Sequence, residues 1–185
     1  DNQALKGELN MRKLIYHVAC STDGFIAHTD HTVDGFLNEG RHSADYQESL
    51  RNDYEIALMG RRTYEFGLQF GVTSPYPWLE QYVISRTMEE SPDPDVKLIS
   101  ENAPSFVRAL KEGKGKNIYL CGGAVLAGTL FAEGLVDELA LKLNPVLFGS
   151  GIPLFSEVVS QTALELTDSK IYHNGVALLR YRVEH

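Results

Sequence analysis

Hydrophobic residues in the first two thirds of the chain occur in short runs that polar or glycine-containing segments interrupt. Short runs rich in β-branched and aromatic side chains, each ended by a turn signal, are typical of buried strands. The pattern predicts strands at residues 14–20, 55–59, 82–85, 96–99 and 117–121. The short segment 25–27 resumes the first strand after the break at Ser21-Thr22-Asp23-Gly24.

Three segments between these strands have a helical pattern instead. Phe106, Val107 and Leu110 lie at helical spacing and predict a helix over residues 104–112. Ser43 is a suitable N-cap for a helix that reaches about residue 52. A third helix follows Gly122-Gly123, has its apolar residues at 125, 126, 130 and 131, and ends at Gly134.

The last third of the chain predicts antiparallel strands. Residues 136–143 alternate between apolar and polar, and segments 164–172 and 176–183 flank Asn174-Gly175, a strong hairpin signal. Helices and strands alternate first and antiparallel strands follow. We therefore predict an α/β fold with a mostly parallel mixed sheet and an antiparallel C-terminal hairpin.

Composition fits one globular domain, which we place at residues 11–185, with residues 1–10 as a polar tail, native or added. The chain has 185 residues, of which 43% are hydrophobic and 23% charged. No apolar run approaches the ~20 residues of a membrane span. The net charge of −8 gives nucleic-acid binding no electrostatic support. Cys20 and Cys121 are too few for a disulfide framework and should be buried. We expect a cytoplasmic protein without a membrane or nucleic-acid partner.

Three turns that directly follow predicted strands carry groups suited to phosphate. They are Gly60-Arg61-Arg62-Thr63, Ser85-Arg86-Thr87 and Gly122-Gly123-Ala124. Guanidinium and hydroxyl donors, free N–H groups at a helix start, and glycines that allow close backbone approach all favour phosphate. Each turn taken singly is equally compatible with an ordinary polar or structural turn. Together they predict one site, because ligands of open α/β sheets bind at the carboxyl ends of the strands.

These turns, with the segments 21–27 (STDGFIA) and 144–151 (NPVLFGSG), resemble the dihydrofolate-reductase-like superfamily. The closer resemblance is to the reductase (C-terminal) domain of the riboflavin-biosynthesis deaminase–reductase and its stand-alone relatives. The segments occur in the family's order and cover nearly all of residues 11–155. The resemblance implies a three-layer α/β/α fold, NADPH as the cofactor and a homodimer.

The resemblance also implies a role for each matching residue. Val18, Ala19 and Ile26 would line the nicotinamide pocket. Gly60, Arg61, Arg62 and Thr63 would meet the phosphates, and Ser85, Arg86 and Thr87 the adenosine 2′-phosphate. Gly122 and Gly123 would pass under the pyrophosphate, in the family often through a cis bond, and Ala124, Val125 and Leu126 would continue the cofactor site.

Some positions depart from the family pattern. Asp45 lies within one position of the acidic residue that helps to protonate the pterin in dihydrofolate reductases, so it is the candidate proton relay. The alternative is a surface aspartate at a helix start. Ala127 stands where those enzymes have a tyrosine beside the nicotinamide. Residues 42–54 lack the Asp-Asp-Pro stretch of the riboflavin-type domain, so neither named substrate follows from the sequence.

Histidines add no metal site to this prediction. His28 and His31 lie near Asp30 and Asp34, but no third well-placed ligand is evident, and a polar loop is the better interpretation. His17, within a strand, should be packed or hydrogen-bonded.

The sequence therefore predicts an NADPH-dependent reductase that transfers a hydride to a C=N or C=O carbon of a pterin- or pyrimidine-type molecule. One alternative is the 5-amino-6-(5-phosphoribosylamino)uracil reductase of riboflavin biosynthesis. Another is a catalytically silent module that binds NADPH. A homodimer is expected because Val176, Leu178 and Leu179 would form an apolar strand near a sheet edge that needs a cover. The loop 149–156 is the other possible cover.

Overall fold

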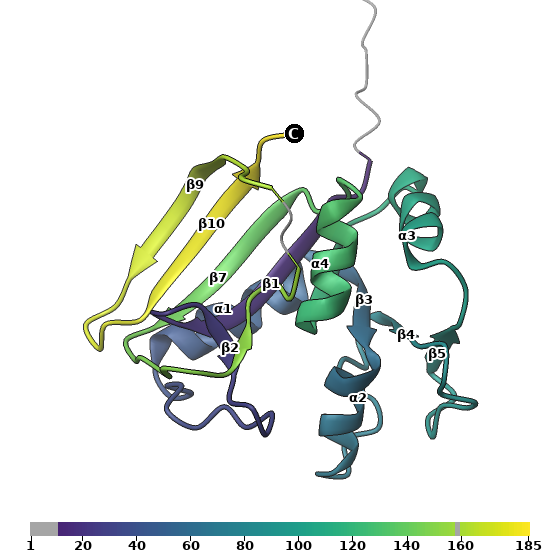
Figure 1. Cartoon of the computed structure of the whole chain (residues 1–185), viewed down its shortest axis with the longest axis horizontal. Helices are drawn as coiled ribbons and strands as arrows, with labels where there is room; N and C mark the ends of the chain where they lie inside the picture. Colours follow the sequence, from purple (N-terminus) through teal and green to yellow (C-terminus); the bar gives the residue numbers. More distant parts are fainter. Residues whose placement is uncertain (1–10, 158–159) are drawn as a thin grey trace, which may run out of the picture.

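A single eight-stranded sheet forms the centre of the computed structural model, which describes residues 11–157 and 160–185 (Figure 1). The strand order is β5-β4-β3-β6-β1-β7-β10-β9. Neighbouring strands from β5 to β7 are parallel, whereas β10 is antiparallel to both β7 and β9. The strands are β1 (Leu14–Ser21), β3 (Tyr54–Gly60), β4 (Glu80–Ile84), β5 (Val96–Ile99), β6 (Asn117–Gly122), β7 (Glu138–Asn144), β9 (Leu164–Ile171) and β10 (Ala177–Val183). The predicted mixed sheet with a C-terminal hairpin is confirmed.

Helices cover both faces of the sheet, so the fold has the three layers that were expected. α1 (Arg41–Asn52) and α2 (Arg61–Leu68) pack on one face, and α3 (Ala103–Glu112) and α4 (Ala124–Ala132) pack on the other. Because side chains alternate along a strand, Tyr16 and Val18 of β1 face α4 while Ile15 and His17 face α1. No helix of the described residues is long and apolar enough to cross a membrane.

Two local predictions were wrong. Helix α1 begins before Ser43, with Gly40 as its N-cap, and Ser43 donates its backbone N–H to the Gly40 carbonyl at 3.1 Å. The segment 25–27 does not extend the first strand. It forms β2 (Phe25–Ala27), which pairs antiparallel with β8 (Ile152–Pro153) in a separate two-stranded sheet. Gly24 reverses the chain with φ 86° and donates to the Ser21 carbonyl at 3.0 Å. A two-residue strand such as β8 has no pattern by which to predict it.

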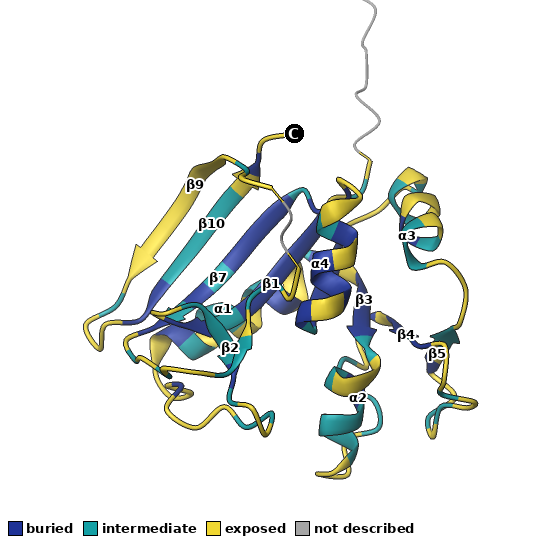
Figure 2. Ribbon diagram, in the orientation of Figure 1, coloured by how far each residue is buried: buried dark blue, intermediate teal, exposed yellow. Residues whose placement is uncertain are grey.

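The edge of the sheet also differs from the prediction. The apolar strand β10, with Leu178 and Leu179, is an inner strand between β7 and β9. The edge strand is β9, and all eight of its residues are exposed along its length (Figure 2). β9 covers β10, so neither a second subunit nor the loop 149–156 is needed for that purpose.

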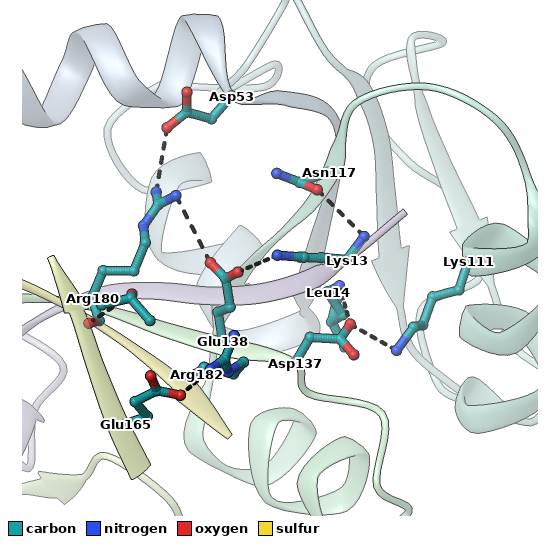
Figure 3. Close-up of polar contacts among 11 residues, drawn as sticks. Lys13, Leu14, Asp53, Lys111, Asn117, Asp137, Glu138, Glu165, Arg180 and Arg182 are labelled. Atoms are coloured by element: carbon teal, nitrogen blue, oxygen red, sulfur yellow. Dashed lines mark hydrogen bonds and ion pairs between the residues drawn. The ribbon is translucent and has the colours of Figure 1, made fainter. Parts of the chain in front are cut away.

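Ion pairs join the hairpin to the rest of the sheet at the end remote from the phosphate-suited turns. The side chain of Glu138, one-tenth exposed, accepts from Lys13 at 2.7 Å and lies 3.8 Å from Arg180 (Figure 3). Arg180 also reaches Asp53, just after α1, at 3.3 Å. One guanidinium therefore connects β10, β7 and the end of α1.

Candidate functional site

The three phosphate-suited turns, at the carboxyl ends of parallel strands, all line one cavity of about 1160 Å³. Gly60 ends β3, Ser85 follows β4, and Gly123 follows β6. The chain folds tightly here: a Cβ at Gly60 would lie 3.2 Å from the backbone nitrogen of Gly123, so glycine allows these two turns to touch. The predicted residues that line the cavity are Val18, Ile26, Gly60, Arg61, Arg62, Thr63, Ser85, Arg86, Thr87, Gly123, Ala124, Val125 and Leu126.

Two helices begin at this cavity with uncapped N-termini. Gly60 precedes α2 and Gly123 precedes α4, and neither helix has a side-chain cap or an acidic residue in its first turn. The first N–H groups of a helix have no partner within it, and the helix dipole makes that end electropositive. Both helix starts can therefore donate to an anion.

Cations accompany the helix starts. Arg61, Arg62 and Arg86 line the cavity, and no Asp or Glu of the described residues lines it, although the whole chain carries a net charge of −8. Arg61 is held in place, because its Nε contacts Glu65 at 2.7 Å and its Nη1 donates to the Thr87 hydroxyl at 2.5 Å. Arg62 and Arg86 form no ion pair with any described residue and remain available. The cavity is thus a local positive site in an acidic protein.

The Ser85 hydroxyl has a structural task in addition to its place on the cavity wall. Ser85 is buried, and its Oγ accepts from the backbone nitrogens of Thr87 at 3.2 Å and Met88 at 3.0 Å. These bonds fix the turn that carries Arg86. Within this turn, Arg86 and Thr87 are therefore the residues that can contact a ligand directly.

Two predicted cofactor positions, Ala19 and Gly122, do not line the cavity, and Ala127 shows why the family's tyrosine is absent. Ala19 does not line the cavity, because it points to the other face of the sheet from Val18. Gly122 also does not line it, but it forms the expected cis peptide bond with Gly123. Ala127 is fully buried in the α4 core, where a tyrosine would not fit without displacing its neighbours.

Asp45 does not line this cavity. It lines a separate cleft of about 670 Å³ between α1 and the β9–β10 hairpin. Its carboxylate accepts from Lys170 at 2.5 Å and from the Tyr172 hydroxyl at 2.5 Å. These two bonds hold the pKa of Asp45 at about 2, so the group has no proton to give near neutral pH. Its relay role stays a prediction without support from this geometry.

Asp23 has a structural role that the sequence of segment 21–27 did not predict. Its carboxylate accepts from the Ser21 hydroxyl at 2.6 Å and from the backbone nitrogens of Phe148 at 3.0 Å and Gly149 at 2.7 Å. The Ser21 bond, followed by those backbone bonds, lowers the pKa of Asp23 to about 2. The two family segments, 21–27 and 144–151, therefore hold each other together beside the cavity.

The remaining candidate residues are structural. His17 is buried, with its Nδ1 2.9 Å from the Tyr54 hydroxyl, and burial lowers its pKa to about 3. Cys20 and Cys121 are free and buried, as expected. His28 stacks on Phe148 with ring centroids 3.9 Å apart. No group of three or more metal-ligating side chains occurs among residues 11–157 and 160–185.

The fold is that of the dihydrofolate-reductase-like enzymes, and sequence comparison defines the family within it. The RibD C-terminal domain family matches residues 12–178, and the chain belongs to that family. It is 34% identical over 171 residues to the uncharacterised protein YwjB of Bacillus subtilis, covering 90% of this chain and 96% of YwjB. A crystal structure from Shewanella sp. PV-4, provisionally named a riboflavin biosynthesis protein, has a TM-score of 0.80 at 26% identity and covers 94% of this chain and 99% of its own.

More distant solved structures share the fold alone. The deaminase/5-amino-6-(5-phosphoribosylamino)uracil reductase of Thermotoga maritima has a TM-score of 0.67 at 17% identity, covering 94% of this chain and 57% of the larger enzyme. Dihydrofolate reductase from Enterococcus faecalis in complex with NADP(H) and RAB-propyl also has a TM-score of 0.67, at 16% identity over 96% of this chain and 98% of its own.

Proposed function

We propose that this protein is an NADPH-dependent reductase of a small heterocyclic compound. The observation that carries the proposal is the single cavity at the carboxyl ends of β3, β4 and β6, with three arginines, two uncapped helix starts and no carboxylate among the described residues. Membership of a family defined by a reductase domain supports the same class of reaction.

The residues present fit a phosphorylated dinucleotide. The start of α2 and Arg62, together with the start of α4, can hold a pyrophosphate, because backbone N–H groups and guanidinium donors suit its oxygens. Arg86 and Thr87 can hold the adenosine 2′-phosphate, which favours NADPH over NADH. When bound, the nicotinamide supplies a hydride for reduction.

The chain's own contribution is alignment and exclusion of water. Val18 and Ile26 give the cavity an apolar wall, against which a flat ring can lie. Arg61 and Ser85 keep the phosphate-suited turns in position before a ligand arrives. Such preorganisation converts binding energy into correct placement of donor and acceptor.

For the acceptor we propose a pyrimidine- or pterin-type molecule with a reducible C=N or C=O carbon. The named activities of similar folds, a ribosylaminouracil reductase and a dihydrofolate reductase, act on these two kinds of ring. The pyrimidine type is favoured, because the chain belongs to the RibD C-terminal family.

We also propose that the protein forms a homodimer through one face of the C-terminal hairpin, the face on the same side of the sheet as α4. Leu164, Leu166 and Ile171 lie on that face of β9, the strand that pairs with β10. They are 41%, 52% and 77% exposed. Exposed apolar side chains at a sheet edge are a feature of interaction surfaces. A second copy of the chain offers the same surface, and a two-fold axis would bury both.

The reductase proposal is tested by following the loss of reduced nicotinamide absorbance with candidate acceptors. We expect NADPH oxidation with 5-amino-6-(5-phosphoribosylamino)uracil, and slower or no oxidation with dihydrofolate. Tight binding of NADPH without oxidation by any heterocycle would instead indicate a silent cofactor-binding module.

A further inference from the structure

The loop after β2 forms part of the lining of the proposed cofactor cavity. It carries a histidine with an unusual backbone conformation. His31 has φ 70° and is the one non-glycine residue with positive φ in the described parts of the chain. A side chain at such a position crowds the backbone; glycine is favoured there, and asparagine, aspartate and histidine are the commonest other residues. Strained positions of this kind gather at ligand sites, where the side chain is needed.

The local turn does not depend on the His31 side chain. The backbone nitrogen of His31 donates to the His28 carbonyl at 2.9 Å, and that of His28 donates to the Thr32 carbonyl at 2.8 Å. The Asp30 carboxylate adds bonds to the backbone nitrogen and the hydroxyl of Thr32, at 3.0 Å and 2.7 Å. The imidazole of His31 forms no hydrogen bond with any residue in ranges 11–157 and 160–185.

His31 lines the proposed cofactor cavity, together with its neighbours Thr29 and Val33. The other ionisable residues that line the cavity, within the described parts of the chain, are three arginines and Cys121. Arginine does not release a proton in proteins, and burial raises the pKa of Cys121. Of the described residues that line this cavity, His31 is the one histidine, the residue type that most often acts as a general acid or base in enzymes.

We infer that His31 donates a proton to the hydride acceptor in this cavity, an inference that rests on the proposed reductase function. Reduction of a C=N or C=O group adds a hydride to carbon, which a bound nicotinamide would supply, and breaks the π bond. The heteroatom then takes one proton from the imidazolium of His31, which becomes neutral imidazole. Because His31 is partly exposed, solvent returns the proton to its ring nitrogen. Asp45 lines a different cleft, where its bonds to Lys170 and Tyr172 lower its pKa to about 2.

Other charged and ionisable groups lie near His31 on its own loop and along the cavity. Asp30, on the same turn, has its pKa lowered by its bonds to Thr32. The charged residues that line the cavity, among the described ones, are Arg61, Arg62 and Arg86. On the loop itself His28 is the other histidine, engaged with Phe148 and with the Asp34 carbonyl at 2.9 Å.

The test compares His31→Asn and His31→Gly with the wild type, using NADPH and 5-amino-6-(5-phosphoribosylamino)uracil or dihydrofolate. Both variants suit positive φ, so the melting temperature should stay equal or rise. kcat/KM should fall about 10²- to 10⁴-fold, the scale of general acid catalysis. The fall of wild-type kcat/KM with rising pH should disappear, and imidazole in solution should restore part of the activity of His31→Gly. His173→Asn, on the exposed hairpin turn, is the matched control and should behave as the wild type.

The outcomes separate the two proposals. Wild-type turnover that survives His31→Asn, with the same pH profile, would overturn the donor role and leave the reductase function standing. A lower melting temperature with unchanged kcat/KM would show that His31 is only structural. Absence of wild-type turnover with both acceptors would overturn the reductase proposal, and the donor role with it.

Discussion

At the scale of single residues, Arg86 separates NADPH binding from NADH binding most cleanly. It is exposed on the cavity wall, free of ion pairs among the described residues, and carried by a turn that Ser85 fixes. Arg86→Ala should weaken NADPH binding by roughly 1.5–3 kcal/mol, the scale of a charged hydrogen bond. NADH, which lacks the 2′-phosphate, should bind almost as before. Calorimetric titration of both cofactors measures the difference.

A second arginine provides the control for this substitution. Arg108 lies on α3 and pairs with Glu133 at 2.5 Å on the surface, so Arg108→Ala should leave both affinities unchanged. If Arg86→Ala weakened both cofactors equally, Arg86 would have no role in recognition of the 2′-phosphate.

The residue scale also shows what the sequence could and could not predict. Arg61, Arg86 and Gly123 line one cavity because each lies in a turn after a strand, and parallel strands bring their carboxyl ends together. Ala19 does not line that cavity, because side chains alternate along β1 and it points to the other face from Val18. His31 was dismissed with its loop, because no pattern of residue types reveals a positive φ at a histidine.

At the scale of elements, Asp45 is a link between α1 and the C-terminal hairpin. Its bonds to Lys170 and Tyr172 lower its pKa to about 2, below the ordinary value near 4 for aspartate. A group with a lowered pKa in the folded state stabilises the fold above its ordinary pKa, and this stabilisation is lost as pH falls through the lower value. Asp45→Asn should therefore reduce the melting temperature at neutral pH. The difference from wild type should vanish toward pH 2, while NADPH affinity stays unchanged.

Melting curves at several pH values check this prediction, with Glu48→Gln as the control. Glu48 is exposed about one turn further along the same helix and forms no ion pair with the described residues. A pH-independent effect of Asp45→Asn, or an equal effect of Glu48→Gln, would mean that the link to Lys170 and Tyr172 contributes nothing specific.

Elements were predicted well where local signals bounded them, and poorly where a tertiary contact determined the pairing. β5, which has three apolar residues among its four and a loop on each side, was placed at its true bounds. The segment 25–27 was joined to β1, because three apolar residues cannot show that their partner is β8, far along the chain. The hairpin was recognised from Asn174-Gly175, but which of its strands lies at the edge depends on pairing with β7.

At the scale of the whole molecule, the exposed hairpin face predicts the oligomeric state. We expect a dimer, with twice the monomer mass of 20.6 kDa, in light scattering at micromolar concentration. Leu166→Glu should shift the mass toward the monomer, because it places a charge in the apolar patch. Asp168→Asn also changes the charge by one unit, with the opposite sign and on the opposite face, and should leave the dimer intact. A wild-type monomer, or a dimer unaffected by Leu166→Glu, would contradict this interface.

The central claim is that the cavity with three arginines binds NADPH. The most direct measurement is a titration of the wild-type protein with NADPH and with NADH, followed by the fluorescence of the reduced nicotinamide. The account predicts saturable binding of both, with NADPH bound more tightly, because Arg86 and Thr87 can hold a 2′-phosphate. Absence of saturable NADPH binding, or tighter binding of NADH, would contradict it.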